Sequence, residues 1–301
     1  MRLLITLALT TSALVAMPAG AAVAVPTCSG QKATIVGTPG QDYLVGTPGR
    51  DVIVAGDGKD QVLARGGNDL VCGGDGNDQL YGGPGRDVLL GEGSKRELNW
   101  DWSLELLFGG SGADVLRGGP GSEQLYGQGG RDRLFGGDDN DWAYGGGGRD
   151  RALGGDGGDS LSGGGGNDVL RSGLNTIAHS MRFGRTELFS GDPGDDRLIA
   201  GPAPSELSFY AAPRGVTVDL AKGIARGLGR DTISGFATVG GSKHADRILG
   251  SAGDDNLTGG GGADVVRGRA GLDTVGGNNR ARLYGGPGTD SLYPSGKAVA
   301  Y

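Results

Sequence analysis

The sequence predicts an all-β repeat protein, and three observations support this prediction. A nine-residue phrase occurs five times from Gly37 and starts again at Gly82: GTPGQDYLV, GTPGRDVIV, AGDGKDQVL, ARGGNDLVC and GGDGNDQLY. The phrase keeps its register, because residues 37–171 divide into fifteen nonapeptides without a slip. Glycine makes up 67 of the 301 residues, yet an aliphatic residue returns at a fixed place, which distinguishes the chain from disordered glycine-rich sequences.

Each nonapeptide is predicted to form a turn followed by a short strand. Position four is glycine where the backbone needs a positive φ. Position six is Asp in twelve of the fifteen repeats, Glu in two and Arg in one, which places a carboxylate on the turn. Position eight is Leu, Ile or Val in thirteen repeats. In a strand, side chains alternate between faces, so position eight points inward while positions seven and nine point outward.

These repeats resemble the RTX, or haemolysin-type, calcium-binding repeat GGxGxDxUx. The resemblance implies a right-handed parallel β-roll, a β-helix solenoid in which two nonapeptides make one coil. It also implies multiple Ca²⁺ ions in the turns between coils, held by Asp side chains and backbone carbonyl groups.

Residues 1–24 are predicted to be a secretory signal peptide. One basic residue precedes an apolar run from Leu3 to Val15, and small residues favour cleavage after Ala21 or Ala24. A membrane anchor is the weaker alternative, because the apolar run is short for crossing a bilayer. We therefore expect a secreted, extracellular protein with no transmembrane segment after removal of the signal.

Residues 25–36 are predicted to form an N-terminal cap. Cys28 and Cys72 are the two cysteines of the chain, and an even number in an exported protein favours a disulfide. Such a bond would hold the cap over the open first coil, where strand edges otherwise invite pairing with other chains. The alternative is two separate thiols.

Residues 91–108, GEGSKRELNWDWSLELLF, form a degenerate part of the predicted β-roll of residues 37–171. They fill two nonapeptides and keep Leu98 and Leu107 at position eight. We expect one full coil that stays in the stack, with a gap in the carboxylate row at Arg96. A protruding loop that carries Trp100 and Trp102 is the alternative.

The nonapeptide phase breaks at residue 172 and returns at Gly241. Residues 172–240 resemble the longer segments that interrupt RTX repeats, and we expect wider coils of the same solenoid. The alternation of VTVDL at 216–220 predicts a longer strand, and GRDTI reuses Asp231 and Ile233 as positions six and eight. Residues 241–293 are predicted to be C-terminal β-roll repeats, with the Asp-free GNNRARLY as a capping coil, and residues 294–301 a tail.

Two rows of carboxylates follow from two repeats per coil, because residues eighteen apart then stack at about 4.8 Å. One predicted row contains Asp42, Asp60, Asp78, Arg96, Asp114, Asp132, Asp150 and Asp168; the other contains Asp51, Asp69, Asp87, Glu105, Glu123, Asp141 and Asp159. Ca²⁺ takes six to eight hard oxygen ligands, which glycine-rich turns with carboxylates can supply. The predicted metal ligands are Asp42, Asp51, Asp60, Asp69, Asp78, Asp87, Asp114, Glu123, Asp132, Asp141, Asp150, Asp159, Asp168, Asp196, Asp246, Asp255, Asp264, Asp273 and Asp290.

Stacked carboxylates repel each other by about 1 kcal/mol per adjacent pair even at the dielectric constant of water. Divalent ions between the coils would turn this repulsion into attraction, so folding and calcium binding are expected to be coupled. The alternative is a solvated acidic surface on a roll that folds without metal, with arginines at positions five and seven neutralising some of the carboxylates.

An outward aromatic ladder is predicted from position nine of alternate repeats, which reads Val54, Cys72, Leu90, Phe108, Tyr126, Tyr144 and Ser162. An exposed ladder of this kind could bind a glycan or a protein. Otherwise it stabilises neighbouring strands, or the chain after residue 171 covers it.

The function expected from the sequence is a secreted, non-catalytic calcium-binding protein. The formal net charge of −7 disfavours nucleic acid as a partner. No G-x-S-x-G or H-E-x-x-H motif occurs, and there is no cysteine pair with zinc spacing. The expected partners are calcium ions and a cell-surface glycan or protein. The alternatives are a glycan- or surface-binding module that uses the aromatic ladder, and a secreted hydrolase or lyase that uses residues 205–240.

Overall fold

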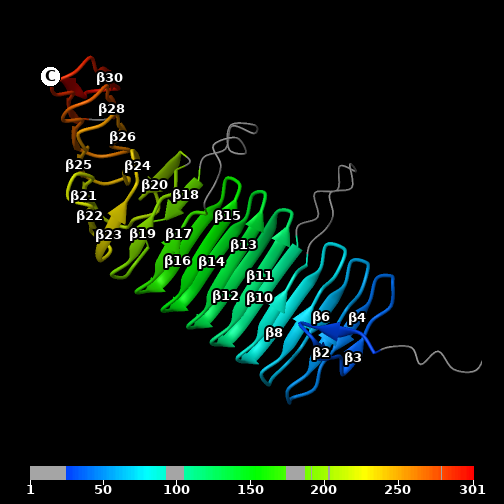
Figure 1. Cartoon of the computed structure of the whole chain (residues 1–301). Coiled ribbons are helices and arrows are strands. Elements are labelled where there is room, and N and C mark those ends of the chain that lie inside the picture. The colour runs from blue at the N-terminus through cyan, green and yellow to red at the C-terminus, as the bar shows by residue number, and fades with distance from the viewer. Residues whose placement is uncertain (1–24, 93–104, 174–186, 191, 203, 279) are drawn as a thin grey trace, which may run out of the picture.

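The protein is a parallel β-solenoid of about 13 coils, with two nonapeptides and about 18 residues per coil (Figure 1). This computed structural model describes residues 25–92, 105–173, 187–190, 192–202, 204–278 and 280–301. The predicted signal segment 1–24 and the residues Leu98, Trp100 and Trp102 lie outside the described residues. The described part of the chain contains no helix long and apolar enough to cross a membrane.

Each coil contributes a strand to each of two long sheets. The 13-stranded sheet contains β4 (Tyr43–Val45), β6 (Gln61–Leu63), β8 (Gln79–Gly85), β10 (Glu105–Gly112), β12 (Glu123–Gly130), β14 (Trp142–Gly148), β16 (Ser160–Gly166), β18 (Glu187–Ser190), β20 (Ser205–Ser208), β24 (Thr238–Gly240), β26 (Asn256–Thr258), β28 (Thr274–Gly277) and β30 (Ser291–Pro294). The 16-stranded sheet contains β3 (Ile35–Val36), β5 (Val52–Val54), β7 (Leu70–Cys72), β9 (Val88–Leu90), β11 (Val115–Pro120), β13 (Arg133–Asp138), β15 (Arg151–Asp156), β17 (Val169–Arg171), β19 (Arg197–Ile199), β21 (Thr217–Asp219), β22 (Ile224–Arg226), β23 (Arg230–Ser234), β25 (Arg247–Leu249), β27 (Val265–Arg267), β29 (Arg282–Tyr284) and β31 (Val299–Ala300).

The core consists of columns of position-eight side chains between the two sheets. Leu107 pairs with Leu125 on one sheet, and Leu116 pairs with Leu134 on the other. All four side chains are fully buried, whereas their neighbours in the strands point outward. The aliphatic side chain at position eight therefore points inward, as its period predicts. Each nonapeptide supplies one such side chain to the core.

The segment 91–108 does not form the full coil that the sequence predicts. Leu107 pairs with Leu80, and Val115 pairs with Val88, so the step between these coils is 27 residues instead of 18. Leu107 therefore belongs to the next regular coil, and the chain uses nine more residues at this step than at the others. The repeat phase survives because the excess is itself nine residues, so the phase alone does not distinguish the predicted coil from the alternative loop.

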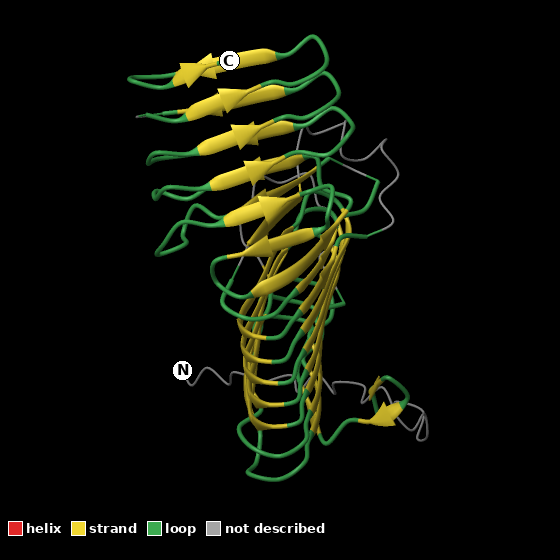
Figure 2. Cartoon of the chain, turned by 90° about the vertical axis from the view of Figure 1, so that its left-hand side faces the viewer, coloured by secondary structure: helices red, strands yellow, loops and turns green. Residues whose placement is uncertain are grey.

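A disulfide joins Cys28 to Cys72, as predicted, but the N-terminal segment does not cover the open first coil. The antiparallel hairpin of β1 (Thr27–Cys28) and β2 (Gln31–Lys32) lies beside the roll (Figure 2). Cys28 and Cys72 form a small buried cluster with Val52 and Leu70 on the outer face of the 16-stranded sheet. Position seven of β5 and β7 is apolar at this place, and the hairpin shields it from water.

The strands that the structure describes between residues 187 and 240 belong to the solenoid, but the widening differs from the prediction. Here β22 runs antiparallel between β21 and β23, so three strands lie between β19 and β25 in one sheet. The other sheet has only β20 at the corresponding place between β18 and β24. The two extra strands lengthen one side, and the part of the roll after this block is turned relative to the first part (Figures 1 and 2). The predicted longer strand at 216–220 is instead the three-residue β21.

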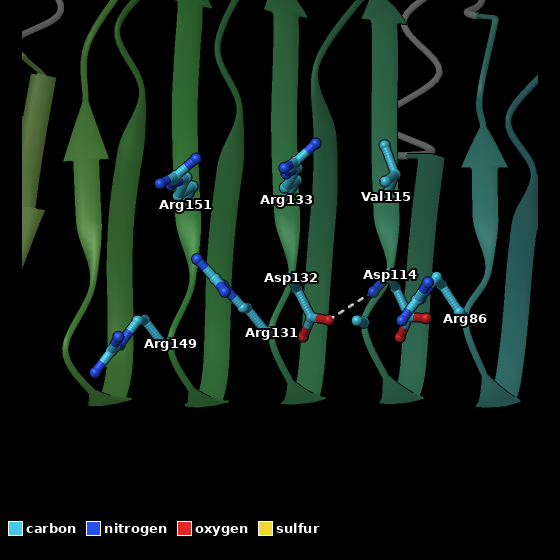
Figure 3. A pocket seen from close by; sticks show the side chains of 9 residues that line it. Arg86, Asp114, Val115, Arg131, Asp132, Arg133, Arg149 and Arg151 are labelled. Atoms are coloured by element: carbon cyan, nitrogen blue, oxygen red, sulfur yellow. Dashed lines mark hydrogen bonds between the residues drawn. The ribbon is translucent and has the colours of Figure 1, made fainter.

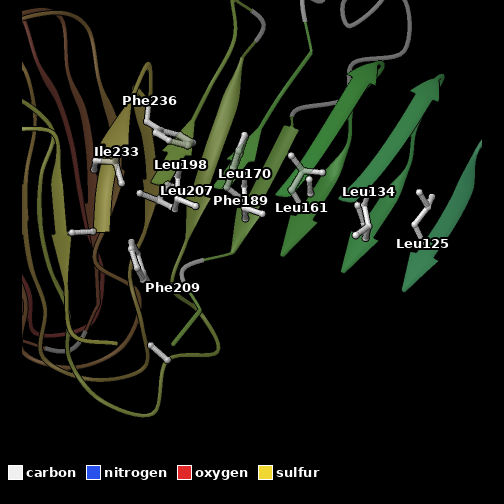
Figure 4. Packing of buried hydrophobic residues seen from close by; sticks show 14 of the residues in the cluster. Leu125, Leu134, Leu161, Leu170, Phe189, Leu198, Leu207, Phe209, Ile233 and Phe236 are labelled. Carbon is white, nitrogen blue, oxygen red and sulfur yellow. The ribbon is translucent and has the colours of Figure 1, made fainter. Parts of the chain in front are cut away.

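Aromatic side chains fill the interior of this block. The rings of Phe189 and Phe236 meet edge to face with their centroids 4.9 Å apart, and Phe209 is buried nearby (Figure 4). Ile233 is buried and pairs with Leu198, as expected for position eight of a repeat.

The C-terminal residues belong to the stack. The Asp-free unit contributes β29, and β31 pairs with β29 on its far side. The predicted capping coil is therefore an internal coil, and the final strands are β30 and β31, the second of which comes from the predicted tail.

Substitution of Gly166 by Ala should destabilise the roll by about 2–5 kcal/mol, whereas substitution of Gly165 should change stability by less than about 1 kcal/mol. Gly166 has a φ of 140°, and an added Cβ would overlap the carbonyl oxygen of Gly148 in the neighbouring coil. Gly165, in the same turn, has open space within 4 Å. Urea unfolding of both variants in excess calcium measures the difference, and equal midpoints would contradict the coil spacing described here.

Candidate calcium-binding site

The position-six carboxylates are held in rows by hydrogen bonds between coils. The backbone N–H of Asp114 donates to Oδ1 of Asp132 at 2.8 Å (Figure 3). That of Asp132 donates to Oδ1 of Asp150, also at 2.8 Å. The same contact recurs along the roll, from 2.7 Å between Asp150 and Asp168 to 3.2 Å between Asp196 and Asp231. One oxygen of each such carboxylate is thus anchored to the preceding coil.

Two rows exist, but their membership differs from the prediction after residue 87. The first carboxylate row contains Asp42, Asp60, Asp78, Glu105, Glu123, Asp141 and Asp159. The second carboxylate row contains Asp51, Asp69, Asp87, Asp114, Asp132, Asp150, Asp168, Asp196 and Asp231. The backbone N–H of Asp87 donates to Oδ1 of Asp114 across 27 residues, and this longer step exchanges the two sets. The predicted gap at Arg96 does not exist, because the second row passes directly from Asp87 to Asp114.

The C-terminal repeats continue both rows for a shorter distance. Asp246 and Asp264 lie on the side of the 16-stranded sheet, and Asp255, Asp273 and Asp290 lie on the other side. All the predicted ligand residues therefore lie in rows. The rows join neighbouring coils, and the most distant members do not meet at one place.

The second carboxylate oxygen lacks a hydrogen-bond partner in most of these residues. Among the described residues, this holds for Oδ2 of Asp60, Asp69, Asp78, Asp87, Asp114, Asp132, Asp141, Asp150, Asp159, Asp168, Asp231, Asp264 and Asp273, and for Oε2 of Glu105 and Glu123. These oxygens are also buried. Burying a carboxylate oxygen without a partner is strongly unfavourable, so such a row requires protons or cations.

The free oxygen faces a small space beside the glycine at position one. A Cβ added at Gly109 would lie 2.8 Å from Oδ2 of Asp114 and 2.9 Å from the carbonyl oxygen of Gly127. At Gly127, the corresponding distances are 2.6 Å to Oδ2 of Asp132 and 2.5 Å to the carbonyl oxygen of Gly145. In these two repeats the carboxylate oxygen and the carbonyl oxygen of the next coil thus converge on one point, which the glycine leaves open.

This donor set suits a hard cation such as Ca²⁺, which takes oxygen ligands. In the described part of the chain, no cluster of three or more His, Cys, Asp or Glu side chains could hold a metal ion. A cation in these turns would therefore take most of its ligands from backbone carbonyl groups, with one or two carboxylates from adjacent coils. The residues present fit this mode of binding.

Burial raises the pKa of many carboxylates in the interior of the rows of the metal-free chain. It raises the pKa of Asp87 and Asp132 to about 7, and the charges of neighbouring row members add to the effect. The pKa of Glu105 rises to about 9, through burial and through the charges of Asp78 and Glu123. The shifts show that the rows cannot easily be fully ionised without a counter-charge.

Glu105 and Asp231 belong to the rows but were not among the predicted ligands. Both carboxylate oxygens of Glu105 are buried and lack partners. Asp231 accepts from the backbone N–H of Asp196, in line with its place in the GRDTI phrase. Both residues stand at position six of their repeats, and this is the sequence signal that identifies them as row members.

The predicted aromatic ladder combines residues from opposite faces. Val54, Cys72 and Leu90 lie on the 16-stranded sheet, whereas Phe108, Tyr126, Tyr144 and Ser162 lie on the 13-stranded sheet. The actual ladder begins with Tyr81, which stacks on Phe108 with ring centroids 4.8 Å apart. The 27-residue step between Tyr81 and Phe108 again explains the exchange.

A family model described as the RTX calcium-binding nonapeptide repeat matches residues 36–71, 73–94, 108–143, 144–175 and 240–275. These ranges cover more than half of the chain. They include most of both carboxylate rows and the first C-terminal repeats. A search of the curated proteins found no match.

The metal-free chain should lose stability as the pH rises from about 4 to about 7. Carboxylates with a raised pKa in the folded state, such as Asp87 and Asp132, bind protons that the unfolded chain has already released in this range. The folded state therefore holds more protons, and the free energy of unfolding decreases with increasing pH. The far-UV circular dichroism signal of β-structure in chelator at pH 5 and pH 8 tests this, and it should be weaker at pH 8. In excess calcium we expect stability to rise with pH instead, because protons and cations compete for the same oxygens. A β-signal in chelator that grows with pH would contradict the prediction.

Proposed function

The chain belongs to the RTX calcium-binding nonapeptide repeat family, and from this we propose that it is a secreted, non-catalytic protein whose roll folds when Ca²⁺ enters its turns. The observation that supports the proposal most directly is the two rows of buried carboxylate oxygens without partners. The proposed ligands are the predicted position-six residues together with Glu105 and Asp231, each with nearby backbone carbonyl groups. The role we propose is structural: a stiff surface scaffold whose shape depends on external calcium.

The proposed ions would relieve the repulsion between stacked carboxylates that the fold itself creates. Parallel pairing brings each row carboxylate within about one strand spacing of the next. An ion that two coils share would neutralise both and connect them. Each nonapeptide contributes one core side chain, so the apolar core is thin, and ion binding would add a substantial part of the stability.

Export is proposed from two features. The signal-like sequence at residues 1–24 directs secretion in other proteins, and the Cys28–Cys72 disulfide is typical of an oxidising compartment. Extracellular calcium concentrations also suit turns whose ligands are mostly carbonyl groups, since extracellular calcium modules bind more weakly than cytosolic ones.

A second candidate function is glycan binding on the 13-stranded sheet. Tyr81, Phe108 and Tyr126 stack with centroids 4.8 and 4.9 Å apart, and Tyr144 follows in register. Trp142 is 58 % exposed beside them. Tyr81, Phe108 and Tyr126 are half-buried and stack on one another, so the exposed Trp142 and Tyr144 at the end of this aromatic strip offer the aromatic surface on which a sugar ring could stack.

Chelated protein should be largely unfolded, and millimolar calcium should restore the β-structure, as followed by far-UV circular dichroism. Asp132→Asn with Asp150→Asn should raise the calcium concentration for half-folding about tenfold, equivalent to about 1.4 kcal/mol. Asn keeps the oxygen that accepts the N–H but removes the anionic oxygen. Asp57→Asn with Asp138→Asn is the matched control, because both residues are exposed and the charge change is the same. Full β-structure in chelator, or equal shifts in the two double variants, would refute calcium-coupled folding.

For the second candidate function, Trp142→Ala with Tyr144→Ala should abolish retardation of the calcium-loaded protein in gels that contain a neutral polysaccharide such as hydroxyethyl cellulose. The physical reason is the loss of the exposed end of the aromatic strip. Tyr43→Ala with Tyr210→Ala removes two exposed tyrosines outside the strip and should leave mobility unchanged. If the parent protein is not retarded in any neutral polysaccharide, the glycan role is excluded for this face.

A further inference from the structure

Five arginines gather on the outer face and edge of the 16-stranded sheet. Arg86, Arg131 and Arg149 occupy position five of their turns, and Arg133 and Arg151 occupy position seven on β13 and β15 (Figure 3). All five side chains are exposed. They line a cavity of about 320 Å³, which falls within the size range of small-ligand sites. We call this group the arginine cluster.

The guanidinium groups of the arginine cluster are unpaired within the described part of the protein. None of its guanidinium groups forms an ion pair or a side-chain hydrogen bond with another described residue. Asp114 and Asp132 lie at the same cavity, but both are buried and their Oδ1 atoms accept N–H groups from Asp87 and Asp114. These carboxylates face the turn interior, and the arginines face solvent.

The fold forces the cationic groups together. Arg133 and Arg151 are direct partners on adjacent parallel strands, and their outer neighbours in the same column are Val115 and Val169. Like charges placed opposite each other on neighbouring strands are destabilising. Arg131 and Arg149 repeat the arrangement one turn away, eighteen residues apart. A bound anion would remove this repulsion, and the arrangement therefore favours an anionic ligand.

We propose that the arginine cluster is a binding site for a linear acidic polysaccharide, whose sulfate or carboxylate groups the guanidinium groups hold. Guanidinium groups are planar forks that pair with such anions through two parallel hydrogen bonds. The two arginine columns run along the roll axis at the strand spacing, so they match a chain with repeated anionic groups better than a single small ion. Arg171 and Arg197 continue the exposed basic face on β17 and β19.

The choice of a polysaccharide over other polyanions rests on charge and surface. The protein carries a formal net charge of −7, which repels a densely charged duplex over longer distances. The exposed members of the cluster are arginines without an exposed large apolar side chain beside them to insert into a lipid surface. A flexible polymer with more widely spaced charges can engage the arginine columns and avoid the carboxylate-rich parts of the roll.

The test is binding of heparin and of hyaluronate to the full-length, calcium-loaded protein by isothermal titration calorimetry at 0.05–0.2 M NaCl. We expect binding of one or both that weakens with salt, and no binding of neutral dextran. Arg133→Gln with Arg151→Gln should weaken binding about tenfold. The matched control is Arg247→Gln with Arg282→Gln, which should change the affinity less than twofold. Arg247 and Arg282 are also exposed at position seven of the same sheet, but their strand neighbours are uncharged.

Circular dichroism in calcium confirms that each variant is folded before binding is compared, which separates this test from that of calcium-coupled folding. A preference for heparin identifies sulfate as the recognised group, and a preference for hyaluronate identifies carboxylate. The proposal is overturned if neither polymer binds, if the control variant loses as much affinity as the cluster variant, or if duplex DNA binds more tightly than both polysaccharides.

Discussion

Parallel hydrogen bonding between coils places the residues of a nonapeptide on top of their equivalents in the next coil, and the rest of the structure depends on this. At the inward position, stacking produces columns of leucine side chains that are fully buried. At the turn, the same stacking produces rows of carboxylates that repel each other unless a counter-charge is present. One geometric rule thus creates both the apolar core and the electrostatic problem that a cation can solve. Glycine is required where one turn lies against the carbonyl groups of another.

The period of nine was sufficient to predict the solenoid, the inward residues and the carboxylate turns. It was not sufficient to assign residues to the two faces. Since two repeats make one coil, any unit of nine residues that leaves the stack exchanges the faces for all later residues. Residues 91–108 preserve the phase, and the counting therefore placed Asp114 in the row of Asp78 instead of the row of Asp87. The same exchange misplaced Tyr126 relative to Val54 and hid Tyr81 from the ladder.

Other differences arise where tertiary contacts override local pattern. The disulfide could be predicted from the number of cysteines, but the position of the hairpin depends on apolar side chains at Val52 and Leu70, where seven of the fifteen repeats place Gln, Glu, Arg or Ser. The antiparallel β22 could not be predicted from alternation, because alternation is the same for parallel and antiparallel strands. Its consequence is large: two additional strands on one side change the direction of the roll, and Phe189, Phe209 and Phe236 fill the wider interior.

The inward and turn positions are constrained by stacking, so outward positions seven and nine are free to differ between the two sheets. Here they do differ. One face carries stacked aromatic rings at Tyr81, Phe108 and Tyr126, and the other carries in-register arginines at Arg133 and Arg151. Both kinds of column are extended by repetition, so a weak contact at one coil is repeated at the next along a rigid axis. A ligand that is itself a repeating polymer gains from each additional coil, because the later contacts form at a high effective concentration. The solenoid thus arranges single outward side chains into linear binding surfaces. These surfaces form only when the roll is folded, which depends on neutralising the carboxylates in the turns.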